Sequence, residues 1–264
     1  MKLTLLGTGN AIVTKCYNTC FLLHENNQYF LVDGGGGNGL LQQLEAINLD
    51  YRHIHTVFIT HKHLDHFLGI FWLLRMVLSQ CAAQNYEGEL VIYSHEEVIE
   101  LLRDMILRLF PEKMTCFIGQ KVHFVCVQDQ EKKMILNHPV TFFDIHSTKA
   151  KQFGFMMEFD GKRLTCLGDE PYREIEKPYV DHTTWLMHEA FCLYSQKDIY
   201  HPYQKHHSTV KDACMIGNEM HVDNLILYHS EDDHIENRKA LYQEEGKIFQ
   251  GSLYIPDDLE TLEL

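Results

Sequence analysis

Four metal-capable side chains lie within six residues of one another, in the order His61, His63, Asp65 and His66. Their spacing is H-x-H-x-D-H, directly after the apolar run 57–59, which is typical of a buried strand. Imidazole nitrogens and carboxylate oxygens are ligands of zinc and similar divalent ions, and hydrolytic sites keep a coordination position open for water. The chain has 18 histidines, yet chance placement gives such a motif only about 0.005 times per chain. The stretch therefore predicts a metal site at the end of a strand.

Other apolar runs also end in a polar or metal-capable residue. Because ligand sites in α/β proteins lie beyond the carboxyl ends of strands, these runs predict one functional edge shared by several strands. The runs are 28–32 before Asp33, 56–60 before His61, 140–145 before His146, 163–167 before Gly168 and Asp169, 184–187 before His188 and Glu189, and 224–228 before His229.

Helical patterns alternate with these runs, which indicates an α/β class, and no linker or repeat divides the chain. We therefore expect a single domain over residues 1–264. The expected helices cover 38–47, 67–80, 96–109, 210–220 and 237–245.

Charge and cysteine content limit the classes of function. The formal charge of −14 and the lack of a basic block disfavour a protein whose main task is to grip a polyanion. The eight cysteines contain no C-x-x-C pair, which is typical of a reduced, cytoplasmic setting. The longest apolar stretch is interrupted by Gly69 and Arg75, so we expect no membrane span.

In its motifs the chain resembles the metallo-β-lactamase-fold superfamily, and within it the ribonuclease Z-like branch. The superfamily motif is matched by the stretch 61–66, and the matches run in order along the whole chain. The branch features are Leu6-Gly7-Thr8-Gly9, Asp33-Gly34-Gly35, His188-Glu189-Ala190 and His207-Ser208-Thr209. The resemblance implies a metallo-β-lactamase fold, an αββα four-layer sandwich of two mixed sheets with the helices outside.

The resemblance also implies a centre with two divalent ions. Zn²⁺ is the first expectation, and Mn²⁺ or Fe²⁺ accept the same ligands. One ion would be held by His61, His63 and His146, the other by Asp65, His66 and His229, with Asp169 as the bridge. Two such ions share and activate a hydroxide. Asp33 would orient a ligand histidine, although a plain turn is an alternative for the Asp33-Gly34-Gly35 stretch.

Three residues are the expected catalytic groups. By resemblance, His207 would protonate the leaving oxygen, Glu189 would orient His207 and raise its pKa, and Asp65 would accept a proton from the attacking water. The alternative for His207 is that it merely caps the helix that begins near Ser208.

Two departures from the branch bear on the substrate. Enzymes of this branch that trim tRNA carry a long arm between the third histidine and the bridging aspartate, whereas only 22 residues separate His146 from Asp169. The branch also tends to have a serine and an arginine after the last histidine, whereas Ser230 is followed by three acidic residues. We therefore expect a small phosphodiester or an RNA 3′ end as substrate, and extended tRNA binding is disfavoured.

The leading hypothesis is a two-metal phosphodiesterase that resembles ribonuclease Z. The alternatives are a thioester, lactone or β-lactam hydrolase of the same fold, and a non-catalytic metal-binding regulatory protein. The segment 87–137 is read as a lid or a homodimer surface beside the site, or else as additional core. Lys149 and Lys151, close after His146, are candidate contacts for a phosphate oxygen.

Overall fold

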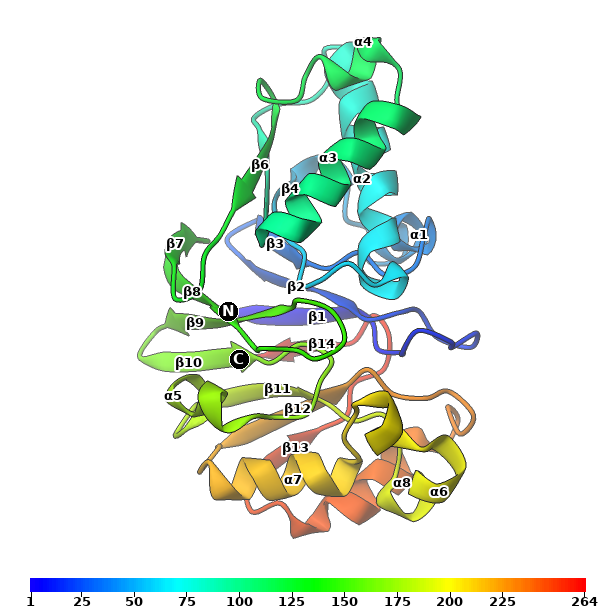
Figure 1. The fold of residues 1–264 in the computed structure, drawn as a ribbon, viewed down its shortest axis with the longest axis vertical. Helices are drawn as coiled ribbons and strands as arrows, with labels where there is room; N and C mark the ends of the chain where they lie inside the picture. The colour runs from blue at the N-terminus through cyan, green and yellow to red at the C-terminus, as the bar shows by residue number, and fades with distance from the viewer.

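The computed structural model describes all residues from 1 to 264 and contains two sheets of seven strands each (Figure 1). The first sheet has the order β14 (Thr261–Glu263), β1 (Lys2–Gly7), β2 (Cys20–Glu25), β3 (Gln28–Val32), β4 (Ile54–Phe58), β5 (Leu90–Ser94) and β6 (Val122–Cys126). The second has the order β13 (Ser252–Tyr254), β12 (Asn224–Tyr228), β11 (Trp185–Glu189), β10 (Lys162–Cys166), β9 (Phe153–Phe159), β8 (His138–Asp144) and β7 (Lys132–Ile135).

Each sheet is parallel in one part and antiparallel in the other. Strands β3 to β6 are parallel in the first sheet, and β10 to β13 are parallel in the second. Both sheets are therefore mixed, as expected, and each presents a row of parallel carboxyl ends.

Helices cover the outer face of each sheet (Figure 1). On the first sheet lie α1 (Gly39–Ala46), α2 (Leu64–Ala82), α3 (Glu96–Leu109) and α4 (Glu112–Thr115). With the second sheet lie α5 (Lys177–Val180), α6 (Lys197–Tyr200), α7 (Val210–Glu219) and α8 (Arg238–Glu245). Short 3₁₀ turns complete the chain: η1 (Tyr51–His53), η2 (Glu174–Glu176), η3 (Tyr194–Gln196), η4 (Pro202–Lys205) and η5 (Gly246–Ile248).

Three apolar cores separate these four layers. One lies between the first sheet and α1 to α4, a second between the two sheets, and a third between the second sheet and α7 and α8. In the middle core the ring centroid of Phe58 lies 4.8 Å from that of Phe142 and 6.0 Å from that of Phe155. The αββα sandwich expected from the sequence is confirmed.

The expected helices are all present, with small shifts at their ends. Helix α2 begins at Leu64, three residues before the expected start, so Asp65 and His66 lie in its first turn. The expected strand at 184–187 extends as β11 through Glu189, because all five of its side chains are buried. No helix of the structure is both long and apolar enough to cross a membrane.

The segment 87–137 contributes to both sheets. It supplies β5, β6, α3 and α4 on the side of the first sheet and β7 at the edge of the second. Three apolar side chains of α3, Val98, Leu102 and Ile106, belong to the core beneath the helices. These side chains therefore agree with the interpretation of the segment as additional core, whereas Leu107 and Leu109 are exposed.

The stretch between His146 and Asp169 forms a plain hairpin. Strands β9 and β10 pair from Phe159 and Lys162, so only Asp160 and Gly161 form the turn. Both turn residues have positive φ, 48° and 74°, as a two-residue type I′ turn requires. No arm extends from this part of the structure.

Candidate metal centre

The candidate site lies where the carboxyl ends of parallel strands from both sheets meet. Asp33 follows β3, and the H-x-H-x-D-H stretch follows β4, both in the first sheet. Asp169 follows β10 and His229 follows β12 in the second sheet, while Glu189 ends β11. The two sheets therefore each contribute part of one site.

One carboxylate oxygen lies at the centre of four imidazoles. Asp169 Oδ2 is 3.6 Å from His61 Nε2, 4.0 Å from His63 Nδ1, 3.8 Å from His66 Nε2 and 3.7 Å from His229 Nε2. The other oxygen of Asp169, Oδ1, is buried without a hydrogen-bond partner. Such an arrangement suits a carboxylate that bridges two cations.

The ligand atoms form two groups on either side of Asp169. The first group contains His61, His63 and Asp169. The second group contains Asp65, His66 and His229. Asp65 Oδ2 lies 3.4 Å from His66 Nε2 and 3.5 Å from His229 Nε2, and neither of these nitrogens has a hydrogen-bond partner. Buried polar atoms are normally satisfied, so unpartnered nitrogens aimed at carboxylates fit a pair of metal sites.

His146 is the one expected ligand that the structure does not bring to the centre. It is exposed, it belongs to neither ligand group, and its backbone is left-handed with φ 54°. Arg173 Nη1 donates to the carbonyl oxygen of His146 at 2.7 Å, and Arg173 is itself paired with Glu170 at 3.2 Å. These contacts hold the loop after β8 by its backbone, while the imidazole stays outside.

Asp33 makes three hydrogen bonds beside the site, one of them to the candidate ligand His66. It accepts from the backbone N–H and the hydroxyl of Thr60, each at 2.8 Å, and from His66 Nδ1 at 2.7 Å. Because Nδ1 of His66 is bound to a carboxylate, Nε2 is left to face Asp65 and Asp169. Asp33 has φ 59° and comes just before the turn at Gly35 and Gly36, and its side chain contacts the candidate site through His66.

The glycines after Asp33 allow the chain to lie against α2. Gly34 N donates to His66 O at 2.8 Å, and Gly69 N donates to Gly35 O at 2.9 Å. A Cβ atom on Gly69 would lie only 1.8 Å from Gly34 O. This contact fixes the first turn of α2, and therefore Asp65 and His66, against the end of β3.

Burial and charge set the protonation of the ligands. Burial lowers the pKa of His61 well below its usual value, which keeps the imidazole neutral for coordination. Burial opposes the ionisation of Asp169, but the imidazoles of His61, His229 and His66 outweigh it and hold its pKa well below the usual range. Burial likewise opposes protonation of His66, but Asp65 and Asp33 outweigh it and raise its pKa. The carboxylates around His66 therefore stabilise a positive charge at this position.

Glu189 and His207 lie beside the ligands and face one another. His207 is only 7% exposed, and its Nδ1 lies 3.6 Å from Glu189 Oε2, both atoms being buried without another partner. The ring of His207 stacks on Phe191 at 4.8 Å and lies 5.2 Å from the ring of His229. The residue that caps α7 is Thr209, which accepts from Asp212 N, so the alternative role of His207 as a helix cap is wrong.

The expectation that Glu189 raises the pKa of His207 is wrong. Burial, aided by Lys149, lowers the pKa of His207 to about 4, and burial raises the pKa of Glu189 to about 7. Because the carboxyl group itself resists ionisation in this dry position, it does not stabilise an imidazolium. Of the two groups, Glu189 therefore holds a proton more readily than His207 does.

A pocket of about 290 Å³ opens onto the metal ligands. Besides His63, Asp65, Asp169, His207 and His229, it is lined by side chains that sequence reasoning did not identify. These include Ile12, Phe191 and Lys205. Lys149, which the sequence did suggest as a phosphate contact, also lines the pocket, and its Nζ lies 3.5 Å from His207 Nε2. Lys151 is not part of this lining; its Nζ lies 5.6 Å from the centre of the Phe153 ring.

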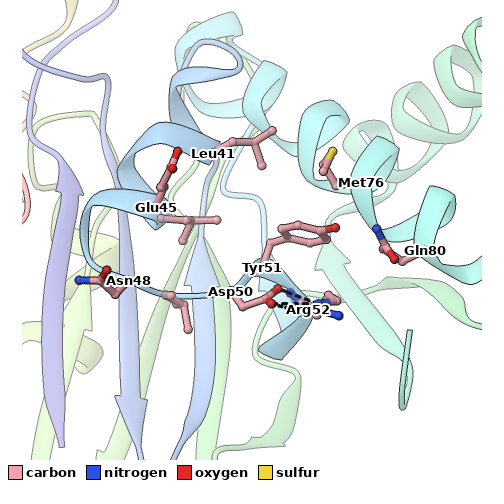
Figure 2. A pocket seen from close by; sticks show the side chains of 10 residues that line it. Leu41, Glu45, Asn48, Asp50, Tyr51, Arg52, Met76 and Gln80 are labelled. Atoms are coloured by element: carbon pink, nitrogen blue, oxygen red, sulfur yellow. Dashed lines mark hydrogen bonds and ion pairs between the residues drawn. The ribbon is translucent and has the colours of Figure 1, made fainter. Parts of the chain in front are cut away.

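A larger pocket of about 640 Å³ lies away from the ligands, between α1, η1 and α2 (Figure 2). Its lining includes Leu41, Tyr51 and Met76, and two of its charged side chains, Asp50 and Arg52, are paired with each other at 2.5 Å. No cluster of metal-capable groups lies there. The candidate metal ligands therefore line the smaller pocket and not the larger one.

Comparisons with known proteins agree with this geometry. The chain is 24% identical to "Ribonuclease Z" of Azobacteroides pseudotrichonymphae genomovar. CFP2, over 96% of this chain and 95% of that one. The metallo-β-lactamase fold protein YhfI of Bacillus subtilis has a TM-score of 0.78 at 18% identity, covering 99% of both chains. Human tRNase Z, short form, has a TM-score of 0.75 at 20% identity, covering 100% of this chain and 99% of that one. The metallo-β-lactamase fold is confirmed.

A family sequence model matches almost the whole chain. It covers residues 1–252 and is described as "Anti-Pycsar protein Apyc1".

Proposed function

The chain belongs to the anti-Pycsar protein Apyc1 family, and we propose that it is a metal-dependent hydrolase that cleaves a small phosphodiester. The observation that carries this proposal is the single oxygen of Asp169 within 4.0 Å of four imidazole nitrogens, with Asp65 beside two of them. A repurposed protein would have no reason to keep this set of side chains aimed at one point, with all but His63 buried. The names of its ribonuclease Z relatives support a phosphodiester as the bond that is cleaved.

Two divalent ions fit the residues present. His61, His63 and Asp169 would hold one, with His146 as a further ligand if its loop moves inward, and Asp65, His66, His229 and Asp169 would hold the other. When bound, such ions supply an activated water and positive charge for the oxygens of a phosphodiester. Asp65 lies within the same cluster as a carboxylate able to accept the proton of that water.

His207 and Glu189 would deliver the proton that the leaving oxygen needs. An alkoxide leaves poorly unless it is protonated. His207 Nε2–H would donate to the departing oxygen while Nδ1 takes up the carboxyl proton of Glu189, 3.6 Å away. One proton is lost and one gained by the ring, so no buried imidazolium persists.

The small size of the proposed substrate rests on three features. The hairpin between β9 and β10 has no arm for a large RNA, the chain carries a net charge of −14, and the pocket measures about 290 Å³. Lys149 and Lys205 are local positive charges at this pocket, placed to meet a phosphate. An RNA 3′ end remains within reach of such a pocket, whereas the body of a tRNA would meet an acidic surface.

The proposal is tested by metal analysis combined with a panel of substrates. We expect bound divalent metal and turnover of bis(p-nitrophenyl) phosphate and cyclic nucleoside monophosphates, well above turnover of a 3′-extended tRNA precursor. A thioester and a lactone are included to test which type of bond the protein hydrolyses. Faster turnover of either control would favour the alternative hydrolases, and no turnover of any substrate with metal bound would favour a binding protein.

His207→Ala is expected to lower kcat for an alkyl-leaving phosphodiester by roughly 10²-fold or more, the usual contribution of a positioned acid. The KM should change little, because the proton is transferred only as the bond breaks. The loss should be much smaller with a p-nitrophenolate leaving group, which needs no proton.

His206→Ala is the matched control, since this adjacent histidine is exposed and should retain the wild-type kcat. An equal loss with both leaving groups would contradict the role of His207 as acid, and Glu189→Gln should show the same dependence on the leaving group.

Lys149→Ala is expected to lower kcat/KM for a small phosphodiester by up to about 5-fold, mainly through KM, because an exposed ion pair contributes at most about 1 kcal/mol. Lys151→Ala is the control, because Lys151 carries the same charge in the same loop but lies over Phe153. Steady-state kinetics at low salt would check this, and equal effects of the two variants would contradict direct contact by Lys149.

A further inference from the structure

We propose that Asp181, His182 and His221 form a separate metal-binding site for a transition ion such as Zn²⁺, Ni²⁺ or Cu²⁺. One ligand atom from each of the three side chains lies within 4.8 Å of the others. Asp181 Oδ1 is 3.5 Å from His221 Nδ1 and 3.8 Å from His182 Nε2. Two imidazoles and a carboxylate are a ligand set that ions of this class accept.

The distances fit a shared cation better than direct hydrogen bonds. A hydrogen bond from an imidazole N–H to a carboxylate measures about 2.7–3.2 Å, shorter than either contact. With metal–ligand bonds of about 2.0–2.2 Å, the ligand atoms around a tetrahedral ion lie roughly 3.3 Å apart. Small rotations of the exposed side chains would therefore bring the three atoms to coordination distance.

The backbone holds the two histidines together before any ion binds. His182 N donates to Met220 O at 2.8 Å, and His221 immediately follows Met220, so the two turns are joined directly. Both histidines have left-handed backbones, φ 55° and 52°, and their rings stack at 4.6 Å with an interplanar angle of 11°. Such preorganisation reduces the entropy lost when a ligand binds.

Local electrostatics also favour a cation. His221 lies just beyond the carboxyl end of α7, where the unpaired carbonyls carry partial negative charge. Arg163 Nη2 donates to the backbone carbonyl of Asp181 at 2.5 Å, which leaves the Asp181 carboxylate to the histidines. The histidines are 70% and 63% exposed, so water can complete the coordination.

This cluster is distinct from the hydrolytic centre. His182 and His221 precede the parallel strands β11 and β12, whereas Glu189 and His229 lie at their carboxyl ends. Five residues of strand separate the two edges by ~16 Å. Figure 1 shows α5, which leads into the cluster, and α6 at opposite ends of the second sheet. The cluster therefore offers one metal equivalent in addition to those of the hydrolytic centre.

Nickel binding to the zinc-loaded protein tests the site. After removal of free zinc, we expect wild type to bind one additional equivalent of Ni²⁺ by calorimetry and elemental analysis, and both His182→Ala and His221→Ala to lose it. Turnover of bis(p-nitrophenyl) phosphate should be unchanged in both variants. His53→Ala, at an exposed histidine outside the cluster, is the control and should retain the additional equivalent.

With Cu²⁺ in place of Ni²⁺, the electron paramagnetic resonance spectrum of wild type should show coupling to two imidazole nitrogens, and this signal should be absent from both variants. An additional equivalent that survives both substitutions would overturn the proposal, as would a wild type that binds no more total Zn²⁺ plus Ni²⁺ than the two variants do. Because bound metal decides the outcome and turnover serves only as a control, the result can be interpreted even if the proposed hydrolytic function fails.

Discussion

Asp169→Asn is expected to abolish turnover and to remove metal from the protein. Asp169 Oδ2 lies within 4.0 Å of imidazole nitrogens from both ligand groups, so this one substitution weakens both. Loss of a group that only supports a metal ligand lowers affinity or activity by about 10–100-fold. Loss of Asp169, a candidate ligand of both ions, should lower them by more. Elemental analysis and kcat measured with excess metal would check both effects.

Asp160→Asn is the matched control for this experiment. Asp160 lies in the two-residue turn between β9 and β10, where asparagine is also well accepted, so metal content and kcat should stay at the wild-type level. If Asp169→Asn kept its metal and lost less than about 10-fold in kcat, Asp169 would not bridge two ions.

Gly69→Ala is expected to destabilise the protein and weaken its metal centre together. The added methyl group would lie 1.8 Å from Gly34 O, so α2 must move away from the end of β3. Overpacking costs about 1–3 kcal/mol even among side chains, and a backbone atom yields less readily. The free energy of unfolding should fall by about 3 kcal/mol, which lowers Tm by about 6–12 °C.

The same movement would shift His66 relative to Asp33, so we expect weaker metal binding as well as the lower Tm. Gly37→Ala is the control, because a Cβ on Gly37 meets no atom within 4 Å. Thermal unfolding and metal titration of both variants would check this, and a wild-type Tm for Gly69→Ala would show that the contact can relax.

The parts of the fold that depend on local pattern could be predicted from the sequence. The apolar runs at 28–32 and 224–228 form β3 and β12 with the expected bounds, because polar residues flank them on both sides. Helix α3 also matches its expected range, since its apolar residues recur on one face. The end of β11 was missed because His188 and Glu189 are buried, which their polarity does not indicate.

The parts of the site that depend on distant contacts could not be predicted. The position of His146 is governed by Arg173, which is 27 residues away in sequence. Phe191 reaches the pocket from the loop after β11 and Lys205 from the end of η4, and no local sequence pattern marks either residue as part of a site. The supporting role of Thr60 could have been predicted, since Thr60 directly precedes the first histidine of the motif.

Ser230 illustrates how a missing residue can be replaced from elsewhere. No basic residue follows it in sequence, yet the guanidinium of Arg238 donates to Ser230 Oγ at 2.9 Å and pairs with Asp257 at 3.2 Å. Arg238 is fully buried, so its charge serves to tie the loop after β12 to the carboxyl-terminal segment.

The aromatic packing between the two sheets sets the distance between the candidate ligands that each sheet carries. Phe58 ends β4 three residues before His61, and it packs on Phe142 and Phe155 of the opposite sheet. Since facing sheets keep a separation of about 10 Å that their side chains determine, the width of this dry layer also sets how far the first-sheet ligands stand from Asp169 and His229. A substitution that changes the side-chain volume at Phe58 would therefore change the distance between the candidate ligands of the two sheets without replacing any of them. We expect such substitutions in this core to alter activity.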